Sequence, residues 1–244
     1  MSLDLSNLEH LSLFAAACFL GGGLRGFSGF GGPTTILLLL THVFNPVYLV
    51  FKIVLIDMLV NVHLLPSTIK KAHWRTVAWL IASTLVSMPL GMYLLHHIEP
   101  SWMRKSVGII SALCTLLLIS GYRYKNSLSV IKLTAIGLFS GVIFGATYLV
   151  LTVVVFLLAG PDKADTTRAN IILWSFIMTI IYIPVYLYLG FEGETEWLSL
   201  LFLGGVYAGS AFVGARLFKR VAEQRYRQVA LYFLVLLSVV AIIS

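Results

Sequence analysis

The sequence predicts an all-α polytopic membrane protein built from two inverted repeats of about five helical segments each. Three observations predict this fold class. The 244 residues are 59% hydrophobic and only 11% charged, with a mean hydropathy of +0.95, which leaves too little polar surface for a soluble domain of this size. Apolar segments recur along the whole chain, and two equivalent loops of the two halves carry opposite charge.

The apolar segments number ten. They cover approximately residues 10–24, 30–44, 47–66, 76–96, 103–121, 131–145, 147–160, 168–189, 196–215 and 228–243. The first two, the sixth and the seventh are short. Because a helix needs about 20 residues to cross a bilayer core of about 30 Å, we expect these two pairs to be broken or re-entrant hairpins, and a topology with eight full spans is the competing count.

A glycine-rich stretch at residues 25–33 interrupts the first pair of segments. Glycine costs a helix about 1 kcal/mol per position and proline about 3, so this run is expected to end one helix and begin another. Unwound backbone within a bilayer is tolerated only where protein buries it or where it lines a cavity. A charge near the bilayer centre costs at least about 2.5 kcal/mol, so Arg25 needs a partner or a ligand, and we expect that ligand to be an anion.

The predicted substrate site combines this break with polar residues elsewhere. A broken helix presents free N–H groups, and a guanidinium can hold two oxygens of a sulfonate or carboxylate. The residues expected to bind substrate are Arg25, Ser28, Gly29, Gly31, Gly32, Asn61, Thr147, Asn170 and Trp174. The alternative is that the glycines serve close helix packing and that Arg25 is neutralised inside the protein.

Asp57 lies about ten residues into the third segment, and Asn61 follows at i+4 on the same helix face. Asp57 is either the ion-pair partner of Arg25 or a protonatable coupling site, and the two roles can coexist. Lys52 is grouped with Asp57 as a coupling or ion-pair residue, although its position nearer the outer end would also let its side chain extend to the membrane surface. Arg168, at the cytoplasmic boundary, is expected to anchor its segment.

Short motifs recur in the same order in both halves. Residues 22–26 match residues 141–145, and residues 89–91 match residues 212–214. Five segments per half, an odd number, would invert the second half relative to the first. We therefore divide the chain into a first transmembrane repeat, residues 1–125, and a second, residues 126–244, which together form one integral membrane domain.

Loop charges orient the two halves. The loop after the third segment carries Lys70, Lys71 and Arg75, whereas the equivalent loop of the second half carries Glu192, Glu194 and Glu196. Placing the Lys70 loop in the cytoplasm puts both termini outside and most of the 17 basic residues inside, in agreement with the positive-inside rule. The remaining basic residues assigned to the cytoplasm are Arg123, Lys125, Lys132, Lys163, Arg168, Arg216, Lys219, Arg220, Arg225 and Arg227.

Together these features resemble the TauE/SafE family of membrane transporters. The residues that carry the resemblance are Gly22, Gly26, Gly29, Gly31, Gly32, Pro33, Asp57, 64–66, Trp74, Arg75, 89–91, Gly141, Gly145, 156–158 and 168–170. Members are implicated in moving sulfite, sulfoacetate and other organosulfonates or small anions across the inner membrane. The family usually repeats a glycine-rich break, ended by proline, in the second half. At that position this chain has residues 147–152, which include neither glycine nor proline.

The resemblance implies a secondary transporter that moves a small organic or inorganic anion across the cytoplasmic membrane by alternating access. A passive anion channel on the same scaffold is the alternative. No metal-binding pair, phosphate loop or activated nucleophile is recognisable, so we expect no enzyme activity, no cofactor and no metal. The expected partners are the lipid bilayer, a small anion, a coupling proton or sodium ion, and a second copy that forms a homodimer through Gly204, Gly205 and Gly209, but no nucleic acid.

Overall fold

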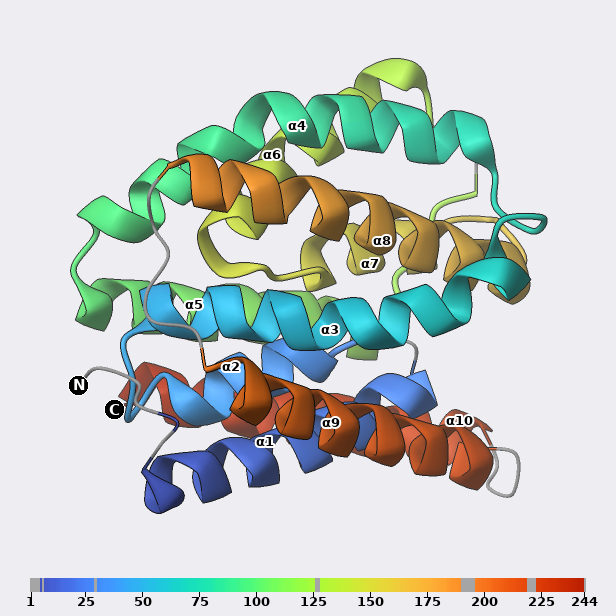
Figure 1. Ribbon diagram of the computed structural model, residues 1–244. Helices are drawn as coiled ribbons and strands as arrows, with labels where there is room; N and C mark the ends of the chain where they lie inside the picture. The colour runs from blue at the N-terminus through green and yellow to red at the C-terminus, as the bar shows by residue number, and fades with distance from the viewer. Residues whose placement is uncertain are drawn as a thin grey trace.

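A computed structural model describes residue 5 and residues 7–28, 30–125, 128–189, 196–218 and 223–243, and in these ranges the chain forms helices and no strands (Figure 1). The helices are α1 (Leu8–Ser28), α2 (Gly32–Leu40), α3 (Pro46–Thr68), α4 (Trp74–His97), α5 (Pro100–Ile119), α6 (Val130–Thr147), α7 (Leu151–Leu158), α8 (Ala164–Tyr188), α9 (Trp197–Phe218) and α10 (Glu223–Ile243). They follow the predicted segments one for one, which confirms the all-helical fold class.

Five of these helices are long and apolar enough to cross a membrane. They are Trp74–His97, Pro100–Ile119, Val130–Thr147, Asp165–Tyr188 and Trp197–Arg216, of 18 to 24 residues each. At about 1.5 Å per residue such helices are about 27–36 Å long, which matches a hydrocarbon core of about 30 Å. The chain is therefore a multi-pass membrane protein.

The prediction that the first and sixth segments are too short to cross the membrane is wrong. α1 has 21 residues and α6 has 18, and only their partners α2 and α7 are short, with nine and eight residues. The glycine-rich stretch at residues 25–33 does end one helix and begin another, as predicted: α1 continues through Arg25 and ends at Ser28, and α2 begins at Gly32. Glycine weakens a helix by about 1 kcal/mol per position, and here the close packing that glycine permits offsets this cost.

The short helices α2 and α7 turn the chain back on itself. Figure 1 shows that α2 returns toward the end of the molecule where α1 begins, and α7 toward the opposite end, where α6 begins. The residue that precedes α2, Gly31, has a φ of 86°, and the residue that follows α6, Tyr148, has a φ of 55°. Both turns therefore pass through the left-handed region, which glycine adopts freely but a side chain opposes by about 1–2 kcal/mol.

Glycines bring α1 into backbone contact with α9. A Cβ added to Gly22 would overlap the main-chain carbonyl of Tyr207, and one added to Gly26 would overlap that of Ala211. In the reverse direction, a Cβ on Gly214 of α9 would overlap the carbonyl of Gly23. No residue with a side chain fits at these positions without moving one helix away from the other.

The same pattern joins α6 to α4. A Cβ on Gly145 of α6 would overlap the carbonyl of Met88, and one on Gly91 of α4 would overlap the carbonyl of Val142. Gly145 and Gly91 are the residues that the sequence motifs align with Gly26 and Gly214. Motifs that match in sequence therefore make matching contacts in the structure.

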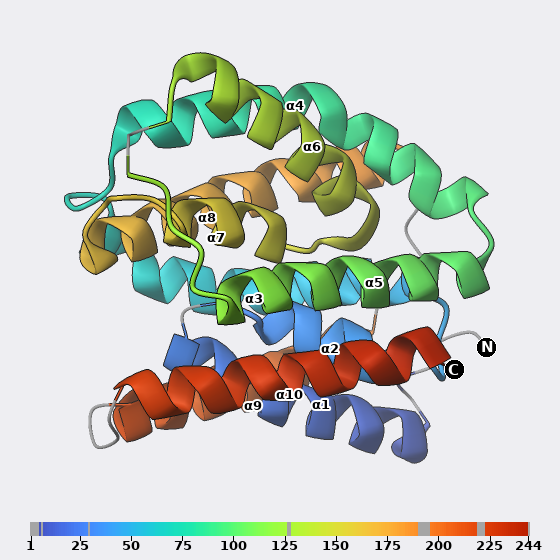
Figure 2. The same cartoon turned by 180° about the vertical axis from the view of Figure 1, so that it is seen from behind.

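The helix partners also exchange between the two halves. α1 packs along α9 and α6 along α4, while α3 packs on α8 and α5 on α10 (Figure 2). If each helix is exchanged for its equivalent in the other half, five places along the chain, the pair α1 and α9 becomes the pair α6 and α4. The pairs of α3 with α8 and of α5 with α10 are unchanged by this exchange. The division into two inverted repeats stays a prediction, and this exchange of partners supports it.

We predict that Gly26→Ala and Gly145→Ala lower the melting temperature of the purified protein, whereas Gly205→Ala and Gly209→Ala leave it unchanged or raise it. Overpacking against a fixed carbonyl costs about 1–3 kcal/mol. An added methyl at Gly205 or Gly209 meets no atom within 4 Å and gains about 1 kcal/mol of helix propensity. Thermal unfolding in detergent measures the difference. Equal destabilisation by all four substitutions would contradict the packing role of Gly26 and Gly145.

The basic loops gather at one end of the molecule. The connections after α3, α5 and α7 lie at the right of Figure 1, opposite the start of α1 and the end of α10 (Figure 1, Figure 2). The described loop residues at that end include Lys70, Lys71, Arg123, Lys125 and Lys163. The positive-inside rule assigns such an end to the cytoplasm.

A cysteine at Lys163 is accordingly expected to react with a membrane-impermeant maleimide only after cells are permeabilised, and a cysteine at Ser101 in intact cells. Both residues are exposed. Lys163 directly precedes α8 and Ser101 lies in the first turn of α5, and these two helices begin at opposite ends of the molecule (Figure 1). The native Cys18 and Cys114 are buried, so the background should be low. Labelling of Lys163→Cys in intact cells would reverse the assigned orientation.

Candidate functional site

Arg25 lies in the last turn of α1, with 1% of its surface exposed. Its guanidinium faces Asp57 of α3, with 3.4 Å between Nε and Oδ1 and 3.4 Å between Nη2 and Oδ2. Asp57 is also 1% exposed. An isolated charge at this depth would cost several kcal/mol, and the pair removes the net charge from the buried site.

Asn61, one helical turn after Asp57, connects to both members of the pair. Its Nδ2 donates to Asp57 Oδ2 at 2.8 Å, and its Oδ1 accepts a hydrogen bond from Arg25 Nη2. Asn61 is completely buried. The i, i+4 spacing predicted from the sequence therefore places its amide beside the Asp57 carboxylate and the Arg25 guanidinium.

Three residues from the second half of the chain complete this group. Tyr207 of α9 donates to Asp57 Oδ1 at 2.8 Å, and Tyr148, between α6 and α7, donates to Asp57 Oδ2 at 3.4 Å. The Tyr148 hydroxyl also lies 2.5 Å from Oγ1 of Thr179 in α8. We call Arg25, Asp57, Asn61, Tyr148, Thr179 and Tyr207 the Arg25 cluster, and it joins elements from both halves of the chain.

Hydrogen-bonding capacity is unevenly filled in this cluster. The Asp57 carboxylate accepts from Arg25 and three neutral donors, Asn61, Tyr148 and Tyr207. The guanidinium, in contrast, leaves Nε and Nη1 without a hydrogen-bond acceptor in the described part of the chain. Guanidinium N–H groups can only donate, so the free Nε and Nη1 groups can each bind a further hydrogen-bond acceptor. The strongest such acceptor is an anionic oxygen.

The start of α2 lies against this cluster. A Cβ on Gly32 would overlap the Tyr207 hydroxyl and would lie 2.8 Å from Cβ of Arg25. Gly32 therefore allows the first turn of α2 to approach Tyr207 and the base of the Arg25 side chain. The amide N–H groups at a helix N-terminus carry a partial positive charge, which adds to the field of the guanidinium.

The other predicted binding residues fall into two groups. Thr147 lies near the cluster in sequence, but its hydroxyl is committed to the main chain: it donates to the Ile143 carbonyl at 2.6 Å and accepts from Leu149 N at 3.3 Å. Asn170 and Trp174 lie on α8 and are completely buried. Neither α8 residue contacts Arg25 or Asp57 through a hydrogen bond of the described structure.

Three further predicted residues need comment. Gly29 and the side chain of Ser28 lie outside the described residues. The expectation that Lys52 extends to the membrane surface is wrong, because only 5% of its surface is exposed and the residue is packed within the helices around α3. Arg168 is exposed in the first turns of α8, where an anchoring residue would lie.

Sequence reasoning missed Tyr148, Thr179 and Tyr207. A signal was available for the two tyrosines, because a phenol within an apolar segment needs a buried hydrogen-bond partner and Asp57 was the acid placed deepest in a segment. Tyr148 also stands where the family usually has a glycine-rich break. Thr179 offered no such signal, because a threonine in a helix commonly bonds its own main chain, as Thr179 does with the Ser175 carbonyl at 2.7 Å.

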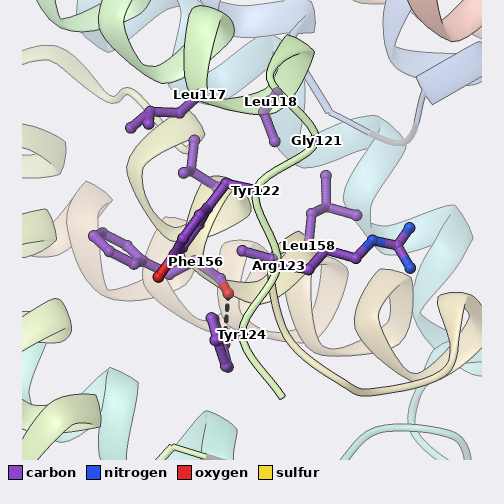
Figure 3. A pocket seen from close by; sticks show the side chains of 10 residues that line it. Leu117, Leu118, Gly121, Tyr122, Arg123, Tyr124, Phe156 and Leu158 are labelled. Carbon is purple, nitrogen blue, oxygen red and sulfur yellow. Dashed lines mark hydrogen bonds between the residues drawn. The ribbon is translucent and has the colours of Figure 1, made fainter. Parts of the chain in front are cut away.

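A separate hollow lies at the end of the molecule that carries the basic loops. It is bordered by α5, the 120–124 loop and α7, has a volume of about 190 Å³, and contains none of the predicted binding residues (Figure 3). The Tyr124 hydroxyl donates to the Phe156 carbonyl at 2.7 Å, while Arg123 points away from Tyr122 and Phe156. Burial raises the pKa of Tyr124 to about 12, so this phenol stays protonated.

Comparison with known proteins gives one match. The family model described as "Sulfite exporter TauE/SafE" matches residues 14–241, nearly the whole chain. No curated protein and no solved structure shows a significant match.

Proposed function

The chain belongs to the sulfite exporter TauE/SafE family, and we propose that it is a secondary transporter that moves a small anion across the cytoplasmic membrane by alternating access. The anion class is sulfite, sulfoacetate or another organosulfonate or carboxylate. The observation that carries this proposal is the buried Arg25 guanidinium, whose Nε and Nη1 have no hydrogen-bond acceptor in the described part of the chain.

The position of the Arg25 cluster supports alternating access. Transporters built from inverted repeats bind their substrates at mid-depth between the repeats, where half-helices end. The cluster takes Arg25, Asp57 and Asn61 from the first half of the chain and Tyr148, Thr179 and Tyr207 from the second. Movement of one half against the other would therefore change the surroundings of a bound anion.

Competition for the guanidinium supplies a coupling mechanism. An anion that binds Arg25 competes with the Asp57 carboxylate, which then loses its charged partner. Asp57 can compensate by taking up a proton, while the phenols of Tyr148 and Tyr207 and the amide of Asn61 remain beside it. Anion occupancy and protonation are thereby linked at one site, in contrast to a passive channel, which cannot accumulate its substrate.

We expect sulfite or sulfoacetate to raise the melting temperature of the purified protein, because a ligand that binds only the folded state stabilises it. Arg25→Ala should weaken this binding by about 100-fold or more, since hydrogen bonds to charged groups contribute about 1.5–3 kcal/mol each. Arg25→Lys should retain part of the affinity, because lysine keeps the charge but loses the planar fork. Calorimetric titration of the three proteins gives the dissociation constants.

A double variant separates binding from folding in this experiment. Arg25→Met alone strands a buried carboxylate, at a cost of about 3–5 kcal/mol, whereas Arg25→Met/Asp57→Leu removes both charges and should be more stable than the single variant. The double variant should fold and bind no anion. Unchanged anion affinity in the folded double variant would contradict the proposed role of Arg25.

For coupling, Asp57→Asn mimics the protonated carboxyl. This variant should still bind the anion, with equal or higher affinity, because no carboxylate competes for Arg25. It should lose the accumulation of anion that a pH gradient drives in proteoliposomes. Accumulation with unchanged pH dependence would show that Asp57 is a structural partner of Arg25 and that the coupling ion acts elsewhere.

A further inference from the structure

A second group of polar side chains lies on α8, between the Arg25 cluster and the end of the molecule that carries the basic loops. Asn170 and Trp174 are 0% exposed and Ser175 is 1% exposed. Within the described structure, Asn170 Nδ2, Trp174 Nε1 and Ser175 Oγ have no hydrogen-bond partner. A buried unsatisfied polar group costs about 1–3 kcal/mol, and native proteins rarely leave three of them close together on one helix.

All three unsatisfied groups can donate a hydrogen bond. The orientation of the Asn170 amide follows from chemistry, because its Oδ1 accepts from the His73 main-chain N–H at 2.7 Å and only an oxygen can face that donor. The NH₂ group of Asn170 is thus the part left free. The indole N–H of Trp174 only donates, and the Ser175 hydroxyl is free to donate.

Asn170 and Trp174 are one helical turn apart, so their free N–H groups lie on the same face of α8. Ser175 follows Trp174 directly and lies about 100° further around the helix, one turn before Thr179 of the Arg25 cluster. Phe144 of α6 packs edge to face on Trp174, with 5.1 Å between ring centroids. Ser140, one turn before Phe144 on the same face of α6, carries another buried hydroxyl without a partner in the described structure.

The group is continuous with the Arg25 cluster. Thr179, one turn after Ser175, donates to the Ser175 carbonyl at 2.7 Å and touches the Tyr148 hydroxyl, which in turn reaches Asp57. The main chain at Ser175 is therefore linked through Thr179 and Tyr148 to Asp57 of α3. Asn170 stands at the N-terminus of α4, through the hydrogen bond from His73, which is the N-cap residue of that helix.

On the other side of the cluster, α8 is chemically different. Tyr182 donates to the Gly145 carbonyl at 2.9 Å and Tyr186 to the Val47 carbonyl at 2.8 Å, so both phenols are satisfied. Their rings stack on each other, and Tyr186 stacks on Phe51 with 4.9 Å between centroids. The free donors of α8 thus lie on the side of the basic loops, and closely packed aromatic rings lie on the opposite side.

We propose that Asn170, Trp174 and Ser175 form a second, uncharged oxyanion subsite, which holds the sulfonate, sulfite or carboxylate group of the substrate before it reaches Arg25. This inference rests on the proposed transport function. Uncharged hydrogen-bond donors bind an anion less strongly than a guanidinium does, so the anion can leave this subsite and move to Arg25. Transport needs this combination of favourable entry and easy release.

Two conservative variants test the subsite. Trp174→Phe removes the indole N–H and keeps a ring, and Ser175→Ala removes only the hydroxyl. Because the Ser175 hydroxyl is unsatisfied without substrate, the melting temperature of substrate-free Ser175→Ala should be unchanged or higher. Trp174→Phe also removes volume from a completely buried position, so its melting temperature should be lower and its anion affinity is measured on the folded protein. The dissociation constant for sulfoacetate or sulfite should rise by about tenfold for each, the equivalent of about 1.4 kcal/mol for a lost hydrogen bond to a charged group.

Asn170→Asp is expected to have a larger effect. Aspartate keeps an oxygen that accepts from the His73 main-chain N–H, but it replaces the free NH₂ group by a second oxygen, which repels an anion. Its dissociation constant should rise more than that of the other two variants. The matched control is Ser111→Ala, which removes a buried hydroxyl without a described partner from α5. The control should leave anion affinity unchanged.

Transport from the two sides gives a second measurement. In proteoliposomes, Trp174→Phe should raise the half-saturating sulfoacetate concentration when the anion is added on the side of the basic loops, and leave it unchanged from the other side. If wild type binds the anion through Arg25 while Trp174→Phe, Ser175→Ala and Asn170→Asp bind equally well, the subsite is wrong and the proposed function stands. If wild type binds neither anion, both proposals are wrong.

Discussion

The buried charge of Arg25 is the constraint on which the rest of the structure depends. A guanidinium that is 1% exposed inside a membrane protein must be neutralised by protein or ligand, and every element around it contributes to this. α3 supplies Asp57 and Asn61, α9 supplies Tyr207, and the turn after α6 supplies Tyr148. The left-handed conformation of Tyr148 is costly for a side chain, and the contacts of its hydroxyl with Asp57 and Thr179 offset this cost.

Glycine packing determines where these groups meet. Gly22 and Gly26 bring α1 within backbone contact of α9, which places Arg25 and Tyr207 on either side of Asp57, and Gly32 leaves room for the Tyr207 hydroxyl at the start of α2. Gly145 performs the corresponding task between α6 and α4, just before Tyr148. The glycine-rich stretch could serve close helix packing or an anion site. The structure shows that the packing is what assembles the cluster, so a role in packing does not compete with a role in binding.

Along α8, the hydrogen-bond donors without an acceptor in the described structure lie on one side of the Arg25 cluster. The Asp57 carboxylate is surrounded by donors, whereas Arg25 and the α8 residues Asn170, Trp174 and Ser175 have donors with nothing to accept them. Toward the opposite end, Tyr182 and Tyr186 are satisfied and stacked. Unfilled donors therefore lie between Arg25 and the end that carries the basic loops, and satisfied aromatic residues lie on the opposite side.

The sequence by itself determined the membrane class, the number of helical segments and the equivalence of the glycine motifs, because hydropathy and glycine spacing are local properties. It also placed Arg25 and Asp57 at similar depth and Asn61 on the Asp57 face. Only the tertiary structure decided that α1 continues through Arg25, that Lys52 is buried, and that Tyr148, Thr179 and Tyr207 join the cluster. Those outcomes depend on contacts between residues far apart in the chain, such as Tyr207 with Asp57, and the free energy of such contacts overrides local helix propensity.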